Sequence, residues 1–167
     1  MGLKTPEQYK SSLRDGRTVF YRGEKVPDVT AHPVIGLAVN HAALDYKMAE
    51  DPKYRDLAVV KDGGSEYSRY YLIPRNADDL RKRSELIAAA TREGETLVVL
   101  IKEIGTDALY ALTMTAERMA KAGKPEYRDR VGKFYQHCRD NDLAVCVAQT
   151  DVKGDRSLGP TQQDHPD

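Results

Sequence analysis

A short polar stretch near the end of the chain carries the residue types best suited to holding a charged or aromatic ligand. It runs from Thr150 to Ser157 and follows the apolar run Leu143–Val147. Charges of both signs surround a central glycine, a pattern typical of a turn that presents backbone amides to an anion or a ring edge. The alternative is an ordinary surface turn after a strand, because Asp, Gly and Ser are common in turns.

Other side chains that could do chemistry form no recognised pattern. The two cysteines, Cys138 and Cys146, are too few for a disulfide framework and lack zinc-ribbon spacing, so we expect reduced thiols. The four histidines are scattered, and neither an HExxH pair nor a GxGxxG phosphate loop occurs in the sequence. We therefore predict no metal site and no Rossmann-type nucleotide site, and the catalytic residues stay unknown.

Composition excludes several classes of partner. The 18.7 kDa chain has a formal net charge of +0, 31% charged residues and a mean hydropathy of −0.63. Lysines and arginines alternate with acidic residues, so no basic stripe favours nucleic acid or an anionic membrane. The N-terminus lacks the apolar core of a signal peptide, and no stretch is long enough to span a membrane. We expect a cytoplasmic protein without nucleic-acid or membrane partners.

Local patterns predict a mainly helical fold. Caps, glycine stops and apolar spacing indicate helices and one small hairpin. The expected elements are a helix from Thr5-Pro6 to Asp15-Gly16, a hairpin of Arg17–Tyr21 with Lys25–Val26, a helix over Val34–Glu50, a loop over Lys61–Ser65, a strand or extended arm over Glu66–Ile73, and helices over Asn76–Arg92, from Glu95 or Thr96 to Gly123, and Pro125–Asn141.

Two features of this pattern predict which helix is central and where the chain divides into domains. The helix that ends near Gly123 is apolar around much of its circumference, so we expect Leu100 and Ile104 to lie at the centre of the bundle. Leu143–Gln149 is rich in valine and reads as a strand. We divide the chain into a helical domain, residues 1–142, and the start of a second domain, residues 143–167.

Two long motifs and one short one resemble a known family. The segments YKSSLRDGRTVFYRGEKVPDVTAHPVI (9–35) and TDVKGDRSLGPTQQDHPD (150–167), with GTDAL (105–109) between them, are similar to the N-terminal region of the 4-hydroxyphenylacetate 3-hydroxylase / 4-hydroxybutyryl-CoA dehydratase family. The resemblance covers essentially all 167 residues, which correspond to about the first third of a family member. It implies the N-terminal helical domain of an acyl-CoA dehydrogenase-like fold, followed by the first strand of a truncated middle β domain.

The same resemblance implies FAD as cofactor and assigns the polar stretch to the flavin site. The expected cofactor-binding residues are Thr150, Asp151, Lys153, Gly154, Asp155, Arg156 and Ser157. Hydroxyls and backbone amides would donate to the flavin, Arg156 would place a positive charge near a pyrophosphate or an anionic flavin, and Asp155 would orient Arg156. The alternative is that Asp155 and Arg156 only pin a loop at a domain junction.

This chain departs from the family at the positions that select the reaction. Where the dehydratase branch has two cluster-binding cysteines, the matching positions are Val99 and Glu103, so an iron–sulfur cluster is not expected. Where the hydroxylase branch contacts its phenol with Arg, Tyr and His, the matching positions are Val98, Lys102 and Val147, of which Lys102 could still present a charge. The substrate is therefore left open.

Three functions remain. The resemblance favours the N-terminal part of an enzyme that hydroxylates an aromatic substrate with oxygen and with reduced FAD supplied by a flavin reductase. A 4-hydroxybutyryl-CoA dehydratase/vinylacetyl-CoA isomerase acting on an acyl-CoA is the alternative within the family. A non-catalytic helical remnant that self-associates is the alternative outside it. The resemblance also implies a homo-oligomer, since full-length relatives are tetramers. We expect the 167-residue chain alone to be inactive and to bind FAD weakly or not at all.

Overall fold

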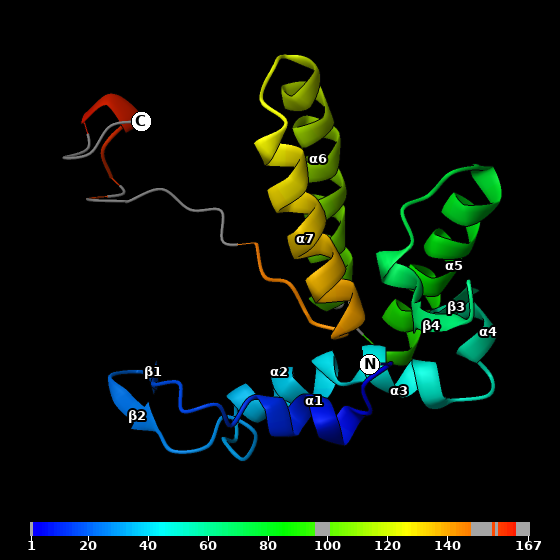
Figure 1. Ribbon diagram of the computed structural model, residues 1–167. Helices are drawn as coiled ribbons and strands as arrows, with labels where there is room; N and C mark the ends of the chain where they lie inside the picture. Colours follow the sequence, from blue (N-terminus) through cyan, green and yellow to red (C-terminus); the bar gives the residue numbers. More distant parts are fainter. Residues whose placement is uncertain (1, 96–100, 148–154, 156, 163–167) are drawn as a thin grey trace.

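The computed structural model describes residues 2–95, 101–147, 155 and 157–162 (Figure 1). The elements, in chain order, are α1 (Pro6–Ser12), β1 (Val19–Tyr21), β2 (Glu24–Val26), α2 (Ile35–Ala42), α3 (Leu44–Glu50), α4 (Arg55–Ala58), β3 (Val59–Asp62), β4 (Ser65–Ser68), the 3-10 turn η1 (Arg69–Tyr71), α5 (Ala77–Glu93), α6 (Ile101–Lys121), α7 (Glu126–Asp140) and the 3-10 turn η2 (Pro160–Gln162). Helices α1–α3 form a base on which α5 and the α6–α7 pair stand (Figure 1). The prediction of a mainly helical fold is confirmed.

The first helix begins as its sequence predicts. The Thr5 hydroxyl accepts a hydrogen bond from the Gln8 amide at 3.1 Å, and the Gln8 side chain accepts one from the Thr5 amide at 2.9 Å. This reciprocal pair satisfies two amides that a helix start leaves without partners. The helix ends at Ser12, before the predicted Asp15-Gly16 stop.

Two hairpins punctuate the helical part. The predicted β1–β2 hairpin is confirmed, with Val19 opposite Val26. The second hairpin, β3–β4, differs from the predicted loop over Lys61–Ser65 followed by a strand or extended arm over Glu66–Ile73: a strand does form there, but it is only Ser65–Ser68, and its partner Val59–Asp62 was not predicted. Val59 lies opposite Ser68 at the open end of the hairpin, and Asp62 lies opposite Ser65 beside the turn. The turn consists of Gly63 and Gly64, whose φ values are 54° and 81°. Paired glycines reach these left-handed conformations without strain, which is what a two-residue hairpin turn requires.

The base is built from α1, α2 and α3. The single helix predicted over Val34–Glu50 is divided into α2 and α3 at Ala43. The rings of Tyr9 and Tyr46 stack with centroids 4.6 Å apart, which joins α1 to α3. A second core cluster packs α3 and α4 against α5, where Leu86 is fully buried. Asn76 caps α5 as predicted, accepting from the Asp79 amide at 2.9 Å.

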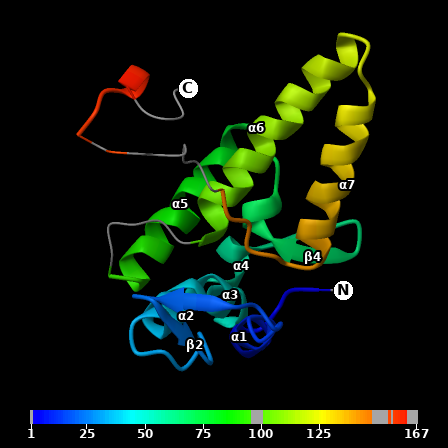
Figure 2. The same ribbon diagram turned by 90° about the vertical axis from the view of Figure 1, so that its left-hand side faces the viewer.

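Helices α6 and α7 run side by side as an antiparallel pair (Figures 1 and 2). The expectation that Ile104 lies at the centre of the bundle is wrong, because its exposed fraction is 56%. The buried stripe of α6 instead contains Lys102, Thr106 and Leu109, spaced as one helix face. Helix α6 has apolar side chains on several of its faces. The face that is buried also contains polar side chains, and these have hydrogen-bond partners. Leu100 lies outside the described residues.

The chain forms no strand over Leu143–Val147, the described part of the strand predicted to reach Gln149. A strand needs a neighbour for its backbone groups, and within the described residues none runs beside it. We call Leu143–Val147 the exit segment, since it leads from α7 toward the predicted flavin-binding stretch.

Candidate functional site

The predicted flavin-binding residues are described only in part. Asp155 and Ser157 lie together: one carboxylate oxygen of Asp155 accepts hydrogen bonds from the Ser157 amide at 2.9 Å and from its hydroxyl at 2.7 Å. These bonds hold the pKa of Asp155 below its usual value. Both residues are exposed, so the turn offers polar groups outward from the chain.

Five predicted residues of this stretch are not among those that the structure describes. They are Thr150, Asp151, Lys153, Gly154 and Arg156. The expected contact between Asp155 and Arg156 therefore stays a prediction. Asp155 has a local partner in Ser157, in addition to the predicted one.

The exit segment is held against α6 and η1. Its first amide, of Leu143, donates to the Cys138 carbonyl at 3.0 Å, and the Tyr71 hydroxyl donates to the Leu143 carbonyl. At Gly105 the backbone of Val145 approaches so closely that an added Cβ would lie 2.8 Å from the Val145 carbonyl carbon and closer still to its oxygen. Only glycine at this position of α6 lets the exit segment lie where it does. Gly105 is the first residue of the GTDAL motif, so this close packing explains why the motif begins with glycine.

A buried ion pair lies at the point where the exit segment leaves α7. The Lys102 ammonium is 2.7 Å from one carboxylate oxygen of Asp142, and the side chains are 1% and 3% exposed. The second Asp142 oxygen accepts from the Lys4 amide at 3.1 Å, and the Asp142 carbonyl accepts from the Tyr46 hydroxyl at 3.3 Å. The Lys102 ammonium also lies 3.7 Å from the centroid of the Tyr46 ring. The suggestion that Lys102 could present its charge to a substrate is therefore wrong.

A second polar cluster lies beside this ion pair, between α3, η1 and α6. Asp45 accepts from the Lys102 amide through Oδ2 at 3.2 Å, while its Oδ1 is buried without a partner. Among the described residues, the other buried side-chain oxygens without a partner are Tyr70 Oη and Glu103 Oε2. Burial raises the pKa of Asp45 to about 6 and raises the pKa of Glu103. Tyr70 is a polar neighbour of Asp45 and lowers its pKa, whereas the negative charge of Asp45 raises the pKa of Glu103. Sequence patterns missed this cluster because its members come from three separate elements.

Arg83 of α5 ties the first turns of α6 to the rest of the bundle. Its guanidinium donates to the Tyr70 carbonyl at 3.1 Å, the Glu103 carbonyl at 3.2 Å, the Thr106 hydroxyl at 3.0 Å and the Asp107 carboxylate at 2.7 Å. A planar donor fork matches several fixed acceptors in this way. The start of the described part of α6 is thus fixed by charged side chains on two sides.

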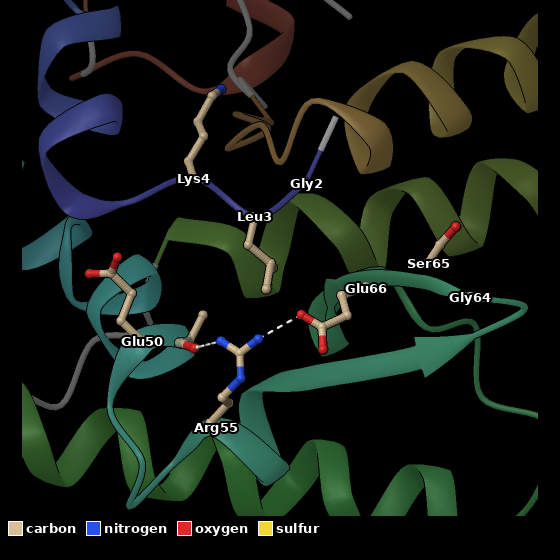
Figure 3. A pocket seen from close by; sticks show the side chains of 9 residues that line it. Gly2, Leu3, Lys4, Glu50, Arg55, Gly64, Ser65 and Glu66 are labelled. Atoms are coloured by element: carbon tan, nitrogen blue, oxygen red, sulfur yellow. Dashed lines mark hydrogen bonds and ion pairs between the residues drawn. The ribbon is translucent and has the colours of Figure 1, made fainter.

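Figure 3 shows a pocket of about 450 Å³ beneath the N-terminal segment. Leu3 points into it, whereas Lys4 points away (Figure 3). Arg55 spans it, donating to the Ala49 carbonyl at 2.7 Å and to Glu66 at 2.6 Å. The Arg55 charge is thus paired with Glu66 inside the pocket and is not free for a ligand. The lining residues are Gly2, Leu3, Lys4, Ala49, Glu50, Arg55, Gly64, Ser65 and Glu66.

The remaining sequence predictions concern the cysteines, metal-binding side chains, membrane-spanning helices and the positions that match the family's reactive residues. Cys138 and Cys146 are both free, the first buried and the second exposed. No cluster of metal-binding side chains occurs among the residues that the structure places. Within the same residues, no helix is both long and apolar enough to cross a membrane. Of the positions matching the family's reactive residues, Val98 and Val99 are not described, and Val147 is exposed at 46%.

The sequence matches a known protein family and a characterised relative. A family model described as the 4-hydroxyphenylacetate 3-hydroxylase N terminal matches residues 5–167. The 4-hydroxybutyryl-CoA dehydratase/vinylacetyl-CoA-Δ-isomerase of Clostridium aminobutyricum is 33% identical over 99% of this chain and 34% of its own length.

Two solved structures superpose closely. An archaeal 4-hydroxybutyryl-CoA dehydratase from N. maritimus has a TM-score of 0.84 at 28% identity, over 99% of this chain and 33% of its own. The oxygenase component (HpaB) of 4-hydroxyphenylacetate 3-monooxygenase, complexed with FAD and 4-hydroxyphenylacetate, has a TM-score of 0.79 at 26% identity, over 98% and 33%. This chain spans about a third of the length of these relatives. The fold is that of the N-terminal region of an acyl-CoA dehydrogenase-like protein, as predicted, and the chain belongs to the 4-hydroxyphenylacetate 3-hydroxylase family.

Proposed function

We propose that the chain is the N-terminal part of a flavin-dependent oxygenase component that hydroxylates a phenolic substrate. The observation that carries the proposal is the superposition, over 98% of the chain, on a relative whose structure holds FAD and 4-hydroxyphenylacetate. In this proposal, residues 1–142 form the helical domain and residues 143–167 begin the middle β domain. Helix α7 ends at Asp140, just before that boundary.

The described residues fit a flavin at the edge of this chain. Asp155 and Ser157 form an exposed turn, as a group shared between this chain and a neighbouring domain requires. With its proton directed to Asp155, the Ser157 hydroxyl oxygen can still accept from a ring N–H. We propose that Thr150, Asp151, Lys153, Gly154 and Arg156 complete this edge, with Arg156 supplying positive charge. Reduced FAD, when bound, supplies the electrons for oxygen activation.

A dehydratase/isomerase function is the second candidate. It is favoured by the higher identity of 33% to that branch and by the higher TM-score of 0.84. Against it stands Glu103, which occupies a position where the resemblance places a cluster-binding cysteine. A carboxylate partly enclosed beside Tyr70 and Arg83 does not replace a thiolate ligand.

The test uses the protein expressed from its full reading frame. With reduced FAD and oxygen, the first candidate predicts hydroxylation of simple phenols; the second predicts turnover of 4-hydroxybutyryl-CoA or vinylacetyl-CoA without oxygen. Arg156→Ala should weaken FAD binding by about 1.5–3 kcal/mol, the range for a hydrogen bond to a charged group. Unchanged FAD affinity in that variant would show that the site is misplaced. A flavin reductase partner, a homo-oligomer and a cytoplasmic location stay predictions.

A further inference from the structure

The buried pair Lys102–Asp142 joins four parts of the chain that are far apart in sequence. Asp142 follows α7, Lys102 lies on α6, Tyr46 on α3 and Lys4 ahead of α1. Both charged groups of the pair have partners there: the ammonium contacts the carboxylate and the Tyr46 ring, and the two carboxylate oxygens accept from Lys102 and from the Lys4 amide. The pair thus holds α3, α6, the end of α7 and the segment ahead of α1 in one arrangement.

The backbone at Asp142 is strained in a way that needs such a restraint. Its φ is 45°, in the left-handed region that non-glycine residues seldom adopt. Aspartate tolerates this conformation better than most residues, and the turn it makes directs the chain from α7 back along α6. Beyond Asp142, the exit segment is fixed again at the Leu143 carbonyl by Tyr71 and at Val145 by Gly105.

Stability alone does not explain a charged pair at this place. Removing two charges from water costs about as much as their attraction returns, and an apolar pair of similar volume often serves equally well. Charged groups that form directional hydrogen bonds restrict the joined segments to a single arrangement, which an apolar pair does not do. Thr150, the first residue of the stretch that we propose to bind flavin, follows Val147 by three positions in the sequence.

We propose that Lys102 and Asp142 are positioning residues that set the course of the exit segment and thereby the placement of the flavin-binding stretch. The flavin part of this inference rests on the proposed function; the positioning part does not. Neither residue contacts the ligand in this proposal. Both act through the backbone of Leu143–Val147.

The test separates position from stability with three variants of the 167-residue chain. Lys102→Met and Asp142→Asn each leave one charge without its partner, and both should lower the melting temperature. The double variant Lys102→Met/Asp142→Asn contains no unpaired charge, so much of the stability should return. Lys121→Met, which changes an exposed lysine at the other end of the same helix, is the matched control.

Amide hydrogen exchange measured by mass spectrometry reports the position of the segment. In the double variant, a peptide covering 141–147 should exchange about tenfold faster than in the wild type, as expected when a local restraint is lost, while a peptide from α7 is unchanged. Wild-type exchange at 141–147 in a double variant that is folded would overturn the proposal. Equal acceleration in both peptides, or a double variant that fails to fold, would also overturn it, because the pair would then support the whole domain.

FAD titration of the protein from its full reading frame links the inference to function. The double variant should bind FAD about tenfold more weakly than the Lys121→Met control. Equal affinity in these two proteins would refute the link to the flavin-binding stretch. If the wild type binds no FAD at all, the proposed function fails, while the hydrogen-exchange result still decides the positioning.

Discussion

Replacing Asp45 by asparagine should stabilise the folded chain at neutral pH, and the gain should vanish in acid. The carboxyl is 3% exposed, and burial raises its pKa from 3.8 to about 6. Between these values the folded chain binds more protons than the unfolded chain, so the stability of the folded chain falls as the pH rises. The carboxyl does not destabilise the fold below pH 3.8, where it is protonated in both states, and its destabilising effect is complete above a pH of about 6. The rise in pKa corresponds to about 3 kcal/mol at pH 7.

The surroundings of Asp45 can accept the amide. Asparagine keeps an oxygen for the Lys102 amide, and its NH2 group can donate to the neighbouring Tyr70 Oη, which has no other partner. The measurement is the free energy of unfolding by urea at several pH values between 3.5 and 7.5 for both proteins. The difference between them should grow from near zero to about 3 kcal/mol across this range.

The difference between variant and wild type removes the contributions of carboxylates common to both. Asp129→Asn, on the exposed surface of α7, is the control and should show a change below about 0.5 kcal/mol at every pH. A pH-independent difference for Asp45→Asn would refute the reasoning, because it would mean that the buried carboxyl titrates alike in folded and unfolded chains. A destabilised variant at pH 7 would show that the charge itself is needed by Lys102.

Three further comparisons, made with five substitutions, test the packing of α6 with its neighbours α5 and α7. Gly105→Ala should destabilise the chain by about 2–3 kcal/mol by forcing the exit segment away, whereas Gly132→Ala, with open space at its Cβ position in α7, should stabilise it by about 0.5–1 kcal/mol; equal melting temperatures would contradict this. Ile104→Asp should cost less than about 1 kcal/mol and Leu109→Asp more than about 4 kcal/mol in urea unfolding, and the reverse order would show that the wrong face of α6 has been assigned. Arg83→Met removes donors from four acceptors and should cost about 2–4 kcal/mol in the same assay, a value that a loss below about 0.5 kcal/mol would contradict.

Local signals predicted the elements whose boundaries are fixed by neighbouring residues. The Thr5–Gln8 capping box and the Asn76 cap appear as predicted because each depends on side chains within three residues. The hairpin turn at Gly63-Gly64 was visible as a turn, but pairing of its flanks depends on tertiary contacts that periodicity does not report. The same limit explains Ile104: a helix that is apolar on several sides does not reveal which side a fold will bury.

The candidate site was predictable mainly through resemblance. The motif at 150–167 drew attention to the flavin stretch, but nothing near it in sequence signalled the Lys102–Asp142 pair, whose members are 40 residues apart. A lysine on an apolar helix is more often a residue of the exposed face. Only its distance to Asp142 and its place over the Tyr46 ring identify it as a buried charge.

The burial of Lys102 also constrains the chemistry that a longer protein could perform at this helix. A phenolate or an acyl-CoA thioester carbonyl is helped by a positive charge near its oxygen. At the position matching the family's phenol-binding tyrosine, this chain has such a charge, but Asp142 neutralises it and the fold encloses it. Lys102 therefore does not supply the cation that recognises the substrate oxygen. Restoring a tyrosine by Lys102→Tyr would leave Asp142 buried without its partner, so the family's contact cannot be regained by that change alone.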